Sequence, residues 1–561
     1  MPGLAAVALA AFAVLAVAVA VAPASHAQQS SSGATDPSKI EQRIERPAAP
    51  RAPVRRVAPP VPSRAPTPAA PAQRFTLIGA EITGSTVYTP DQLGDFYEAY
   101  LGRSISLPEV EAITKAITDR YHRDGYFLAR AVAPPQDAAL GVLRINVIEG
   151  YVERVDYKGA KPGRSGLFDE WAAKIKAERP LKLATLERTL LLMSDAPGLT
   201  VRPGLTAIDE DTGAYALEID LTQTAIDGFA TLDNRGTTTV GPFQTYDGVN
   251  LNDALGLLDR TRLAIFTTPT QSDELRYGEF YQEHILSSEG TRVWLLGTHS
   301  IVATGRRFTS SQESAQGSRV MIGLAQSLLR SREQNLTLNL KADSIDSSKT
   351  SESQIYADRL RMLRFGADYN IKDGIGGTTW VSGEITKGFD ILHASGADST
   401  FVSRTNGQSD FVKYTLDITR QQALIDQWAV QAAVAGQLSP YTLLSPEEFS
   451  VGGRRFGRAY DPADISGSQG AAGYVELQFN PALKLEPLTS WQLYGFYDLG
   501  AVWGEGFTRQ SMASAGGGVR LGLPYNITGG VEVAQPLTRP VTPGEAGNDG
   551  PRVFFNLLGR F

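Results

Sequence analysis

The sequence predicts two small α+β modules followed by a transmembrane, antiparallel β-barrel of about sixteen strands. Three observations support this fold class. An apolar stretch with a small-residue cleavage motif opens the chain, residues 75–225 contain one order of elements twice, and from residue 226 onward helical spacing gives way to short alternating runs. The hydropathy of alternating barrel strands averages out along the sequence, whereas a transmembrane helix would stand out as an apolar run.

The composition excludes several functional classes. The 561 residues include no Cys, which rules out thiol catalysis, zinc–thiolate sites and disulfides. Acidic residues outnumber basic ones, 60 to 53, so nucleic acid is not expected as a partner. The five His are too dispersed for a local metal motif, and the chain lacks a phosphate loop and a G-x-S-x-G elbow. We therefore expect no enzyme, no metal and no other cofactor, with a dispersed Ser/His/Asp site as the alternative.

Residues 1–27 have the pattern of a signal peptide. An apolar run from Leu4 to Val21 is followed by Ser25-His26-Ala27, an A-x-A-like motif after which we place the cleavage site. The alternative is an uncleaved transmembrane anchor, since the first basic side chain is Lys39. No later stretch offers ~20 uninterrupted apolar residues. We therefore expect an exported protein.

Residues 28–74 combine a short polar helix with a basic linker. The helix is expected within residues 28–46, in the run DPSKIEQRIER that starts at Asp36. Residues 47–74 follow with nine prolines, several arginines and no acidic residue. Such a stretch cannot bury a core and is typical of an extended, semi-rigid spacer. A plain tether is its simplest interpretation.

Residues 75–149 form the first predicted module. Its longest helix has Ser106 as a plausible N-cap and Glu109 three residues later, which is the pattern of a capping box. The apolar stripe of this helix comprises Val110, Ile113, Ile117 and Tyr121. The other predicted elements are a strand at 75–78, a helix near 90–101, and strands at 126–132 and 141–148.

Residues 150–225 repeat the order β-α-α-β-β. The predicted elements are a strand at 152–157, helices near 167–177 and over 183–193, and strands at 199–207 and 215–222. Pro197-Gly198 ends the second helix. Two successive copies of one order indicate an internal repeat of small α+β modules.

Residues 226–561 are expected to form the barrel. Apolar and polar side chains alternate along runs such as 336–343, 414–419 and 474–479, which fits a lipid-facing side and a polar lumen. At about 21 residues per strand with its share of the loops, this length gives sixteen strands. A closed barrel leaves no strand edge exposed to lipid. A soluble β-sandwich would alternate as well and is the alternative.

Several motifs are similar to those of a known family. The run from Tyr121 to Arg130 (YHRDGYFLAR), with Pro134-Pro135-Gln136, resembles the signature of the first POTRA module in the two-partner secretion transporters. These are the TpsB family of haemolysin and filamentous-haemagglutinin secretion proteins. Residues 194–199 (SDAPGL) resemble the family's D-x-PG turn, and residues 232–236 (LDNRG) open the barrel as in these transporters.

Two barrel motifs are the most specific part of the resemblance. Residues 452–460 (GGRRFGRAY) resemble a loop that, in this superfamily, folds back into the barrel and ends in a V/I-R-G-F/Y tip. The matching residues are Gly452, Gly453, Arg458 and Tyr460, with Ala459 where Gly is usual. Residues 495–500 (GFYDLG) resemble the family's F-x-D-x-G strand. On a period of two, Phe496, Asp498 and Gly500 share one face, which we expect to line the lumen.

The resemblance also implies roles for individual residues. Arg458 on the loop tip is expected to pair with Asp498 on the strand, because a charge held inside a barrel needs a partner and an Arg fork suits a carboxylate. The alternative is that each is a solvated charge in a water-filled lumen. The terminal Phe561 is expected to be the signal for barrel assembly. Alternatively, it simply ends the strand that closes the barrel.

The resemblance implies an outer-membrane pore that secretes one unfolded, β-rich partner exoprotein without nucleotide. The POTRA modules would lie in the periplasm and bind the partner as an added strand, with 152–157 and 215–222 as candidate edges. The short helix within 28–46 would plug the barrel at rest. Periplasmic chaperones, the barrel-assembly machinery and outer-membrane lipid are further expected partners. The alternatives are a factor that assembles other barrel proteins and, less well matched to the two modules, a passive porin.

Overall fold

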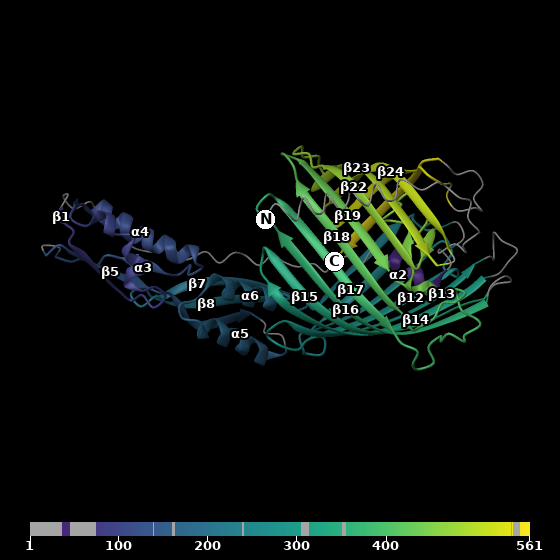
Figure 1. The fold of residues 1–561 in the computed structure, drawn as a ribbon, viewed down its shortest axis with the longest axis horizontal. Coiled ribbons are helices and arrows are strands. Elements are labelled where there is room, and N and C mark those ends of the chain that lie inside the picture. Colours follow the sequence, from purple (N-terminus) through teal and green to yellow (C-terminus); the bar gives the residue numbers. More distant parts are fainter. Residues whose placement is uncertain are drawn as a thin grey trace. The chain divides into compact units, whose positions relative to one another are not determined.

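The structure is a computed structural model that describes residues 36–44, 74–137, 140–159, 163–237, 240–304, 313–350, 355–505, 507–539, 541 and 550–561 (Figure 1). The expected signal peptide at 1–27 and the linker up to residue 73 lie outside these residues. The described chain forms two compact units. One unit contains the two modules, and the other contains the barrel with the N-terminal segment 36–44.

The first module builds its core around one amphipathic helix. Its elements are β1 (Phe75–Thr76), β2 (Gly79–Thr83), α3 (Pro90–Gly94), a 3₁₀ turn (Glu98–Tyr100), β3 (Ser104–Ile105), α4 (Leu107–Arg123), β4 (Arg130–Val132) and β5 (Val142–Ile148). The predicted capping box of α4 is confirmed, and the hydrogen bonds from Ser106 lower the pKa of the Glu109 carboxyl below its ordinary value. The stripe on α4 is buried against the sheet β2-β5-β4.

Three predicted elements of this module are shorter in the structure. The strand expected at 75–78 is split between β1 and β2, which belong to different sheets. The helix expected to Leu101 ends at Gly94, and the strand expected from Tyr126 begins at Arg130. In the last case the backbone N–H groups of Tyr126 and Ala129 bond within a turn, so they are not available to a sheet.

The second module has the same order of elements. It contains β6 (Tyr151–Gly159), α5 (Ser165–Ala177), α6 (Leu183–Ser194), β7 (Leu199–Asp209) and β8 (Ala214–Gln223). The sheet order is β6-β8-β7, with β6 and β8 parallel. β8 therefore has a neighbour on both sides, and the expectation that 215–222 is a free edge is wrong. The edges of this sheet are β6 and β7.

The strands of the barrel, in sequence order, are β9 (Ile226–Asp233), β10 (Thr245–Asn252), β11 (Asp259–Thr267), β12 (Leu275–Ile285), β13 (Thr291–Thr304), β14 (Glu313–Arg330), β15 (Gln334–Thr350), β16 (Ile355–Lys372), β17 (Gly377–Gly388), β18 (Val412–Ala423), β19 (Trp428–Leu438), β22 (Gln469–Phe479), β23 (Ser490–Gly504), β24 (Phe507–Leu523), β25 (Ile527–Pro536) and β26 (Arg552–Arg560). Within the described residues these sixteen strands form one closed, antiparallel barrel, as predicted. No described helix is long and apolar enough to cross a membrane.

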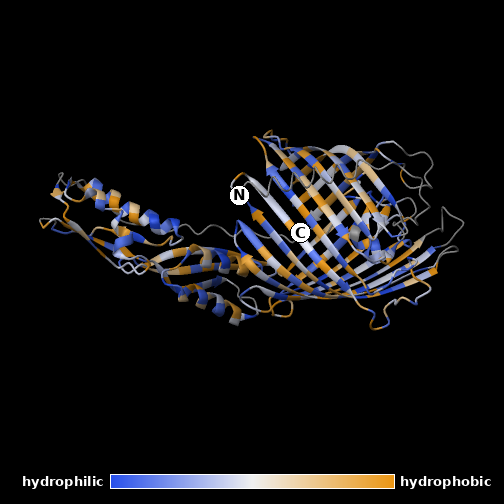
Figure 2. Cartoon of the chain, viewed as in Figure 1, coloured by the Kyte–Doolittle hydropathy of each residue, from blue (hydrophilic) through white to orange (hydrophobic). Residues whose placement is uncertain are grey.

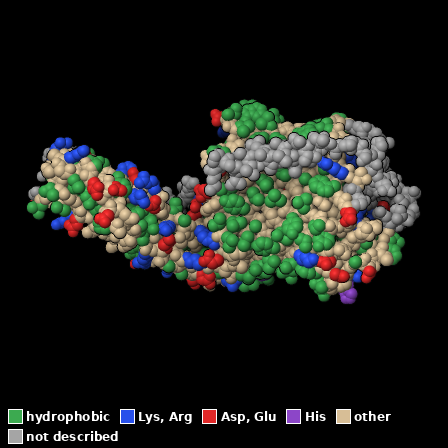
Figure 3. Space-filling model, in the orientation of Figure 1, with side chains coloured by type: hydrophobic (Ala, Val, Ile, Leu, Met, Phe, Trp, Pro, Cys, Tyr) green, Lys and Arg blue, Asp and Glu red, His purple; other side chains and the backbone are tan. Residues whose placement is uncertain are grey.

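The two faces of the barrel wall differ in polarity, as the alternation predicts. Leu363 and Phe365 on β16 are 43% and 50% exposed, while Arg364 between them is 6% exposed. The alternation is visible along the strands in Figure 2, and hydrophobic side chains gather on the outer surface in Figure 3. In this stretch of the wall the charged side chain therefore points into the lumen and the apolar ones face outward.

The barrel closes between its last strand and its first. β26 pairs with β9, and Phe561 continues this pairing through two backbone hydrogen bonds with Gly228, of 2.9 and 3.1 Å. The Phe561 side chain is 73% exposed, on the outward face that also carries Val553 and Leu557. A Cβ atom at Gly228 would lie 2.4 Å from the Phe561 ring, so the ring packs directly on the Gly228 backbone.

Candidate functional site

A loop between β19 and β22, residues 439–468, folds into the barrel, and we call it the inward-folded loop. It contains a 3₁₀ turn (Ser445–Glu447) and a short hairpin of β20 (Phe449–Val451) and β21 (Ile465–Gly467). The tip, residues 452–460, is the motif singled out in the sequence. Gly452, Gly453 and Gly457 adopt positive φ angles of 117°, 96° and 75°, which explains these three glycines. Ala459 does not adopt positive φ and is fully buried, so Ala fits this position.

The tip is fixed by Arg458, which is 5% exposed. Its backbone N–H donates to Asp498 Oδ2 at 2.9 Å, and its Nε lies 3.4 Å from Asp498 Oδ1. Its Nη1 donates to Glu476 Oε2 at 2.7 Å. The structure therefore brings Arg458 and Asp498 together, but the guanidinium makes its shortest bond to a different carboxylate. Two parallel hydrogen bonds to one carboxylate are not the geometry of this pair.

Aromatic rings enclose the Arg458 guanidinium. Its Cζ atom lies 4.0 Å from the ring centre of Phe496 and 4.8 Å from that of Tyr474. These contacts are within cation–π range and exclude water from the charge. Phe496 is thus placed beside Arg458, on the same strand face as Asp498.

Further charges extend this cluster beyond the residues predicted from the sequence. Arg520 donates to Glu476 at 2.6 Å, and Arg235 pairs with Glu532 at 2.5 Å. Arg235 also donates to the Arg458 carbonyl at 3.2 Å. The sequence contained a partial signal, since Glu476 lies in an alternating run and Arg235 in the motif that opens the barrel. Nothing in the sequence showed that they meet Arg458.

The tip is also held through its backbone. Arg552 on β26 donates to the Ala459 carbonyl at 2.9 Å. The Tyr460 hydroxyl donates to the Ala513 carbonyl on β24 at 3.0 Å, and Tyr460 is 1% exposed. Tyr460 is therefore an anchor that joins the tip to the barrel wall.

Glycines in the wall make room for the loop. A Cβ atom at Gly500 on β23 would lie 2.7 Å from Val451 Cγ1 on β20. A Cβ atom at Gly470 on β22 would lie 2.3 Å from the Phe449 ring. The hairpin thus packs directly on wall backbone, and this contact explains the glycine of the F-x-D-x-G motif.

The base of the loop is held by a different part of the barrel wall, on β16 and β18. Glu447 accepts one hydrogen bond from Arg364 on β16 at 2.6 Å and pairs with Lys413 on β18 at 2.7 Å. All three residues are less than 10% exposed. Breaking a buried pair by removing one partner costs about 3–5 kcal/mol, so these contacts fix the loop strongly. The loop is thus held inside the lumen at two charged attachment points.

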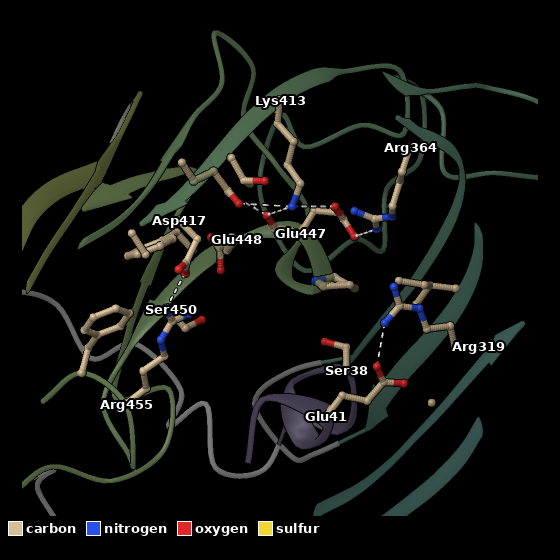
Figure 4. Close-up of a pocket in the computed structure, with 18 of the residues that line it drawn as sticks. Ser38, Glu41, Arg319, Arg364, Lys413, Asp417, Glu447, Glu448, Ser450 and Arg455 are labelled. Atoms are coloured by element: carbon tan, nitrogen blue, oxygen red, sulfur yellow. Dashed lines mark hydrogen bonds and ion pairs between the residues drawn. The ribbon is translucent and has the colours of Figure 1, made fainter. Parts of the chain in front are cut away.

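The N-terminal segment 36–44 lies inside the barrel beside the loop. It forms a 3₁₀ turn η2 (Pro37–Lys39) and one turn of helix α2 (Ile40–Arg43). Glu41 pairs with Arg319 on β14 at 2.7 Å, and Ile40 and Ile44 pack against apolar side chains of the wall. A cavity of about 590 Å³ remains between this segment, the loop and the wall, as Figure 4 shows. Within the described residues, no group of three His, Asp or Glu side chains could hold a metal ion.

Fold and site together define a POTRA-bearing outer-membrane β-barrel with an internal loop and an internal N-terminal segment. Two family models match the chain. The POTRA domain of ShlB type matches residues 75–150, and the model "Haemolysin secretion/activation protein ShlB/FhaC/HecB" matches residues 217–521. The chain belongs to the ShlB/FhaC/HecB family. It is an outer-membrane secretion transporter for a partner exoprotein, with its N-terminal modules in the periplasm.

Individual relatives agree with this assignment. The heme/hemopexin transporter protein HuxB of Haemophilus influenzae is 23% identical over 479 residues, which cover 80% of each chain. The outer membrane transporter CdiB of Escherichia coli is 24% identical over 441 residues, covering 76% of this chain and 71% of CdiB. The solved structure of CdiB from Escherichia coli superposes with a TM-score of 0.69 at 19% identity, over 90% of this chain and 94% of that one. The family favours secretion over the assembly of other barrel proteins.

Gly500→Val tests the packing of the loop on the wall. Overpacking costs about 1–3 kcal/mol, so the equilibrium between docked and undocked loop is expected to shift by roughly 5- to 150-fold toward undocked. The measurement is the rate of proteolytic cleavage in the loop of the purified protein. Gly495→Val is the matched control, because it lies on the outward face of the same strand with no atom closer than 3.8 Å to its Cβ position. Equal cleavage rates in both variants would contradict the packing account.

Proposed function

We propose that this chain carries one unfolded, β-rich exoprotein from the periplasm through the barrel lumen to the cell surface without nucleotide. The supporting observation is the inward-folded loop, which lies inside the lumen and is fixed by reversible, noncovalent contacts around Arg458. A loop held in this way can be displaced by an incoming chain and can return to its place. The Arg458 cluster is therefore proposed to set the resting position of the loop.

The driving force is proposed to come from the partner itself. The periplasm contains no ATP, and the sequence has no phosphate-binding loop. An exoprotein that folds after it emerges cannot slide back, so its folding outside the cell draws the rest of the chain through the pore. Neither a catalytic residue nor a cofactor has a role in this proposal.

Capture of the partner is proposed to occur at β6 of the second module. An extended chain adds to an open sheet edge through main-chain hydrogen bonds, and β6 is one of the two edges. Both edges have an irregular register against β8, but β7 also contains Pro203, whereas β6 contains no proline. Proline is a common protection of an edge strand. β6 is therefore the better docking strand.

The partner itself is expected to be a long, repeat-rich secreted protein encoded by a neighbouring gene. Periplasmic chaperones and the barrel-assembly machinery are proposed to handle the transporter before it folds into outer-membrane lipid. The exposed Phe561 at the end of β26 is proposed as the residue that the assembly machinery recognises.

Arg458→Ala and Asp498→Ala test the role of the loop tip. Each is expected to reduce secretion sharply, because an undocked tip has no fixed place and leaves buried charges unpaired at a cost of about 3–5 kcal/mol. The double variant is expected to secrete at least as much exoprotein as the single variant that secretes less, since one contact can be lost only once. Exoprotein in the medium is measured against barrel protein in the outer membrane.

Arg455→Ala is the control for the tip variants. Arg455 is also a loop arginine, but its pair with Asp417 is half-exposed, and such pairs contribute only about 0–1 kcal/mol. It is expected to secrete normally. Additive losses in the Arg458/Asp498 double variant, or normal secretion by either single variant, would refute the proposed role of the tip.

A photoreactive probe tests the docking strand. Because the chain has no Cys, Arg154→Cys on β6 and Arg202→Cys on β7 each provide a single thiol for a benzophenone maleimide. Both arginines are exposed on edge strands, so they form a matched pair. Illumination in the presence of the exoprotein is expected to cross-link it to the β6 variant. Stronger cross-linking from β7 would refute β6 as the docking strand.

Phe561→Ala tests the assembly signal. The variant is expected to reach the outer membrane in several-fold lower amounts, with exported material accumulating in the periplasm, because the exposed ring is no longer offered for recognition. Tyr525→Ala, which removes another exposed aromatic side chain from the turn between β24 and β25, is the control. Quantitative immunoblots of both fractions provide the measurement. Normal outer-membrane levels of the Phe561 variant would leave Phe561 with no role beyond closing the barrel.

A further inference from the structure

The N-terminal segment is attached to two different parts of the barrel unit. Glu41, Ile40 and Ile44 contact the wall, as described above. Lys39 and Asp36 instead contact the base of the inward-folded loop. Asp36 accepts a hydrogen bond from Ser445, and Lys39 donates to Ser450 Oγ at 2.7 Å. One face of this nine-residue segment therefore rests on the loop.

Of the two residues that contact the loop, Lys39 is more deeply buried than Asp36. Its side chain is 1% exposed and also lies 3.4 Å from the Glu448 carbonyl, 3.4 Å from Ser466 Oγ and 4.0 Å from the Glu448 carboxylate. Ser450 and Ser466 come from the two strands of the loop hairpin. A buried ammonium without such partners would be strongly unfavourable. The position of Lys39 therefore depends on the loop being in place.

Glu448 joins this contact to the connection between β17 and β18. Its carboxylate accepts two hydrogen bonds from Arg404, of 2.5 and 2.7 Å, in the connection between β17 and β18. The preceding residue, Glu447, carries the attachment to Arg364 and Lys413. The base of the loop is thus fastened by two consecutive glutamates, one toward β16 and β18 and one toward Arg404 and Lys39. Figure 4 shows Glu447 and Glu448 on the loop above the N-terminal segment.

We infer that the pair Glu447–Glu448 is a second attachment of the inward-folded loop, independent of Arg458, and that Lys39 couples the N-terminal segment to it. The segment leaves the lumen only when the base of the loop gives way. The tip attachment holds the loop against β22–β25, whereas the loop partners of Lys39 are Glu448, Ser450 and Ser466, which lie outside the tip. Loss of the tip attachment is therefore expected to leave the segment in place.

The inference rests on the proposed function in one respect, namely that the lumen is the transport path. The test is therefore made without any exoprotein. A Ser38→Cys reporter supplies the only thiol of the chain, in a residue that faces the cavity. Its rate of reaction with a membrane-impermeant maleimide in intact cells reports how often the segment is accessible. Conductance in planar bilayers reports how open the lumen is, and a deletion of residues 28–72 marks the fully unblocked state.

Lys39→Met and Glu448→Gln preserve the shapes of the two side chains and remove their charges. Each is expected to raise the labelling rate about tenfold, equivalent to ~1.4 kcal/mol, and to raise conductance toward that of the deletion. The labelling rate of the double variant is expected to rise by less than the two single fold-increases multiplied together, since both substitutions remove one contact. Lys387→Met, which removes a half-exposed ion pair with Asp410, is the matched control. It and Arg458→Ala are expected to leave the labelling rate unchanged.

Three results would overturn the inference. Unchanged labelling in Lys39→Met would mean that the wall alone holds the segment. Fully multiplicative effects of Lys39→Met and Glu448→Gln would mean that the two side chains act separately. Faster labelling in Arg458→Ala would mean that the tip, not the base, controls the segment. Two controls accompany these variants. Outer-membrane levels and heat-modifiable electrophoretic mobility of each variant report whether the barrel has folded. Lys39→Arg keeps the charge and is expected to be labelled as slowly as the chain with Lys39. A failure here leaves the secretion assays of the tip variants unaffected.

Discussion

The structure depends on how charge is accommodated inside a closed barrel. Every second side chain of a strand faces the lumen, so the polar half of an alternating sequence is forced inside. Where the inward-folded loop excludes water, a lumen charge without a partner is costly, whereas a paired one holds two distant segments together. Arg458 with Asp498 and Glu476 at the tip, and Glu447 with Arg364 and Lys413 at the base, are the two places where this constraint fixes the loop.

The apolar contacts of the loop follow from the same arrangement. The hairpin can approach the wall only where the wall lacks side chains, which explains Gly470 and Gly500 beneath Phe449 and Val451. Charge pairing then sets the orientation of the hairpin, while close packing sets its depth. Neither contact is covalent. A loop held in this manner combines a defined resting position with the capacity to move, which a transport channel requires.

Much of the fold could be predicted from the sequence because its signals are local. The period of two along β15, β18 and β22 gives the two faces of the wall, and the spacing of Ile113 and Ile117 gives the core of α4. The face of Asp498 followed from the same periodicity. Strand order in the second module was not predictable in this way, because whether β8 is central depends on which strands pair in space.

The partners of Arg458 were only partly predictable, for a related reason. Asp498 could be proposed because two motifs of one family are expected to meet. Glu476 lies as close to Arg458 as Asp498 does. In the sequence, however, it is one of many carboxylates on the lumen face, and nothing local distinguishes it. The base attachment was not predicted at all, since Glu447, Arg364 and Lys413 belong to segments far apart in the chain. Contacts between such segments follow from the closed barrel.

The central claim is that the inward-folded loop must leave its place on the wall for secretion to occur. A reversible cross-link between loop and wall tests it most directly. A Cβ atom at Gly500 would lie 2.7 Å from Val451 Cγ1, so Val451→Cys with Gly500→Cys suits a disulfide in a chain that otherwise has no Cys. Secretion of the exoprotein is expected to stop when this disulfide forms and to resume when it is reduced, with both single variants unaffected by oxidant. Continued secretion through the oxidised double variant would contradict the account.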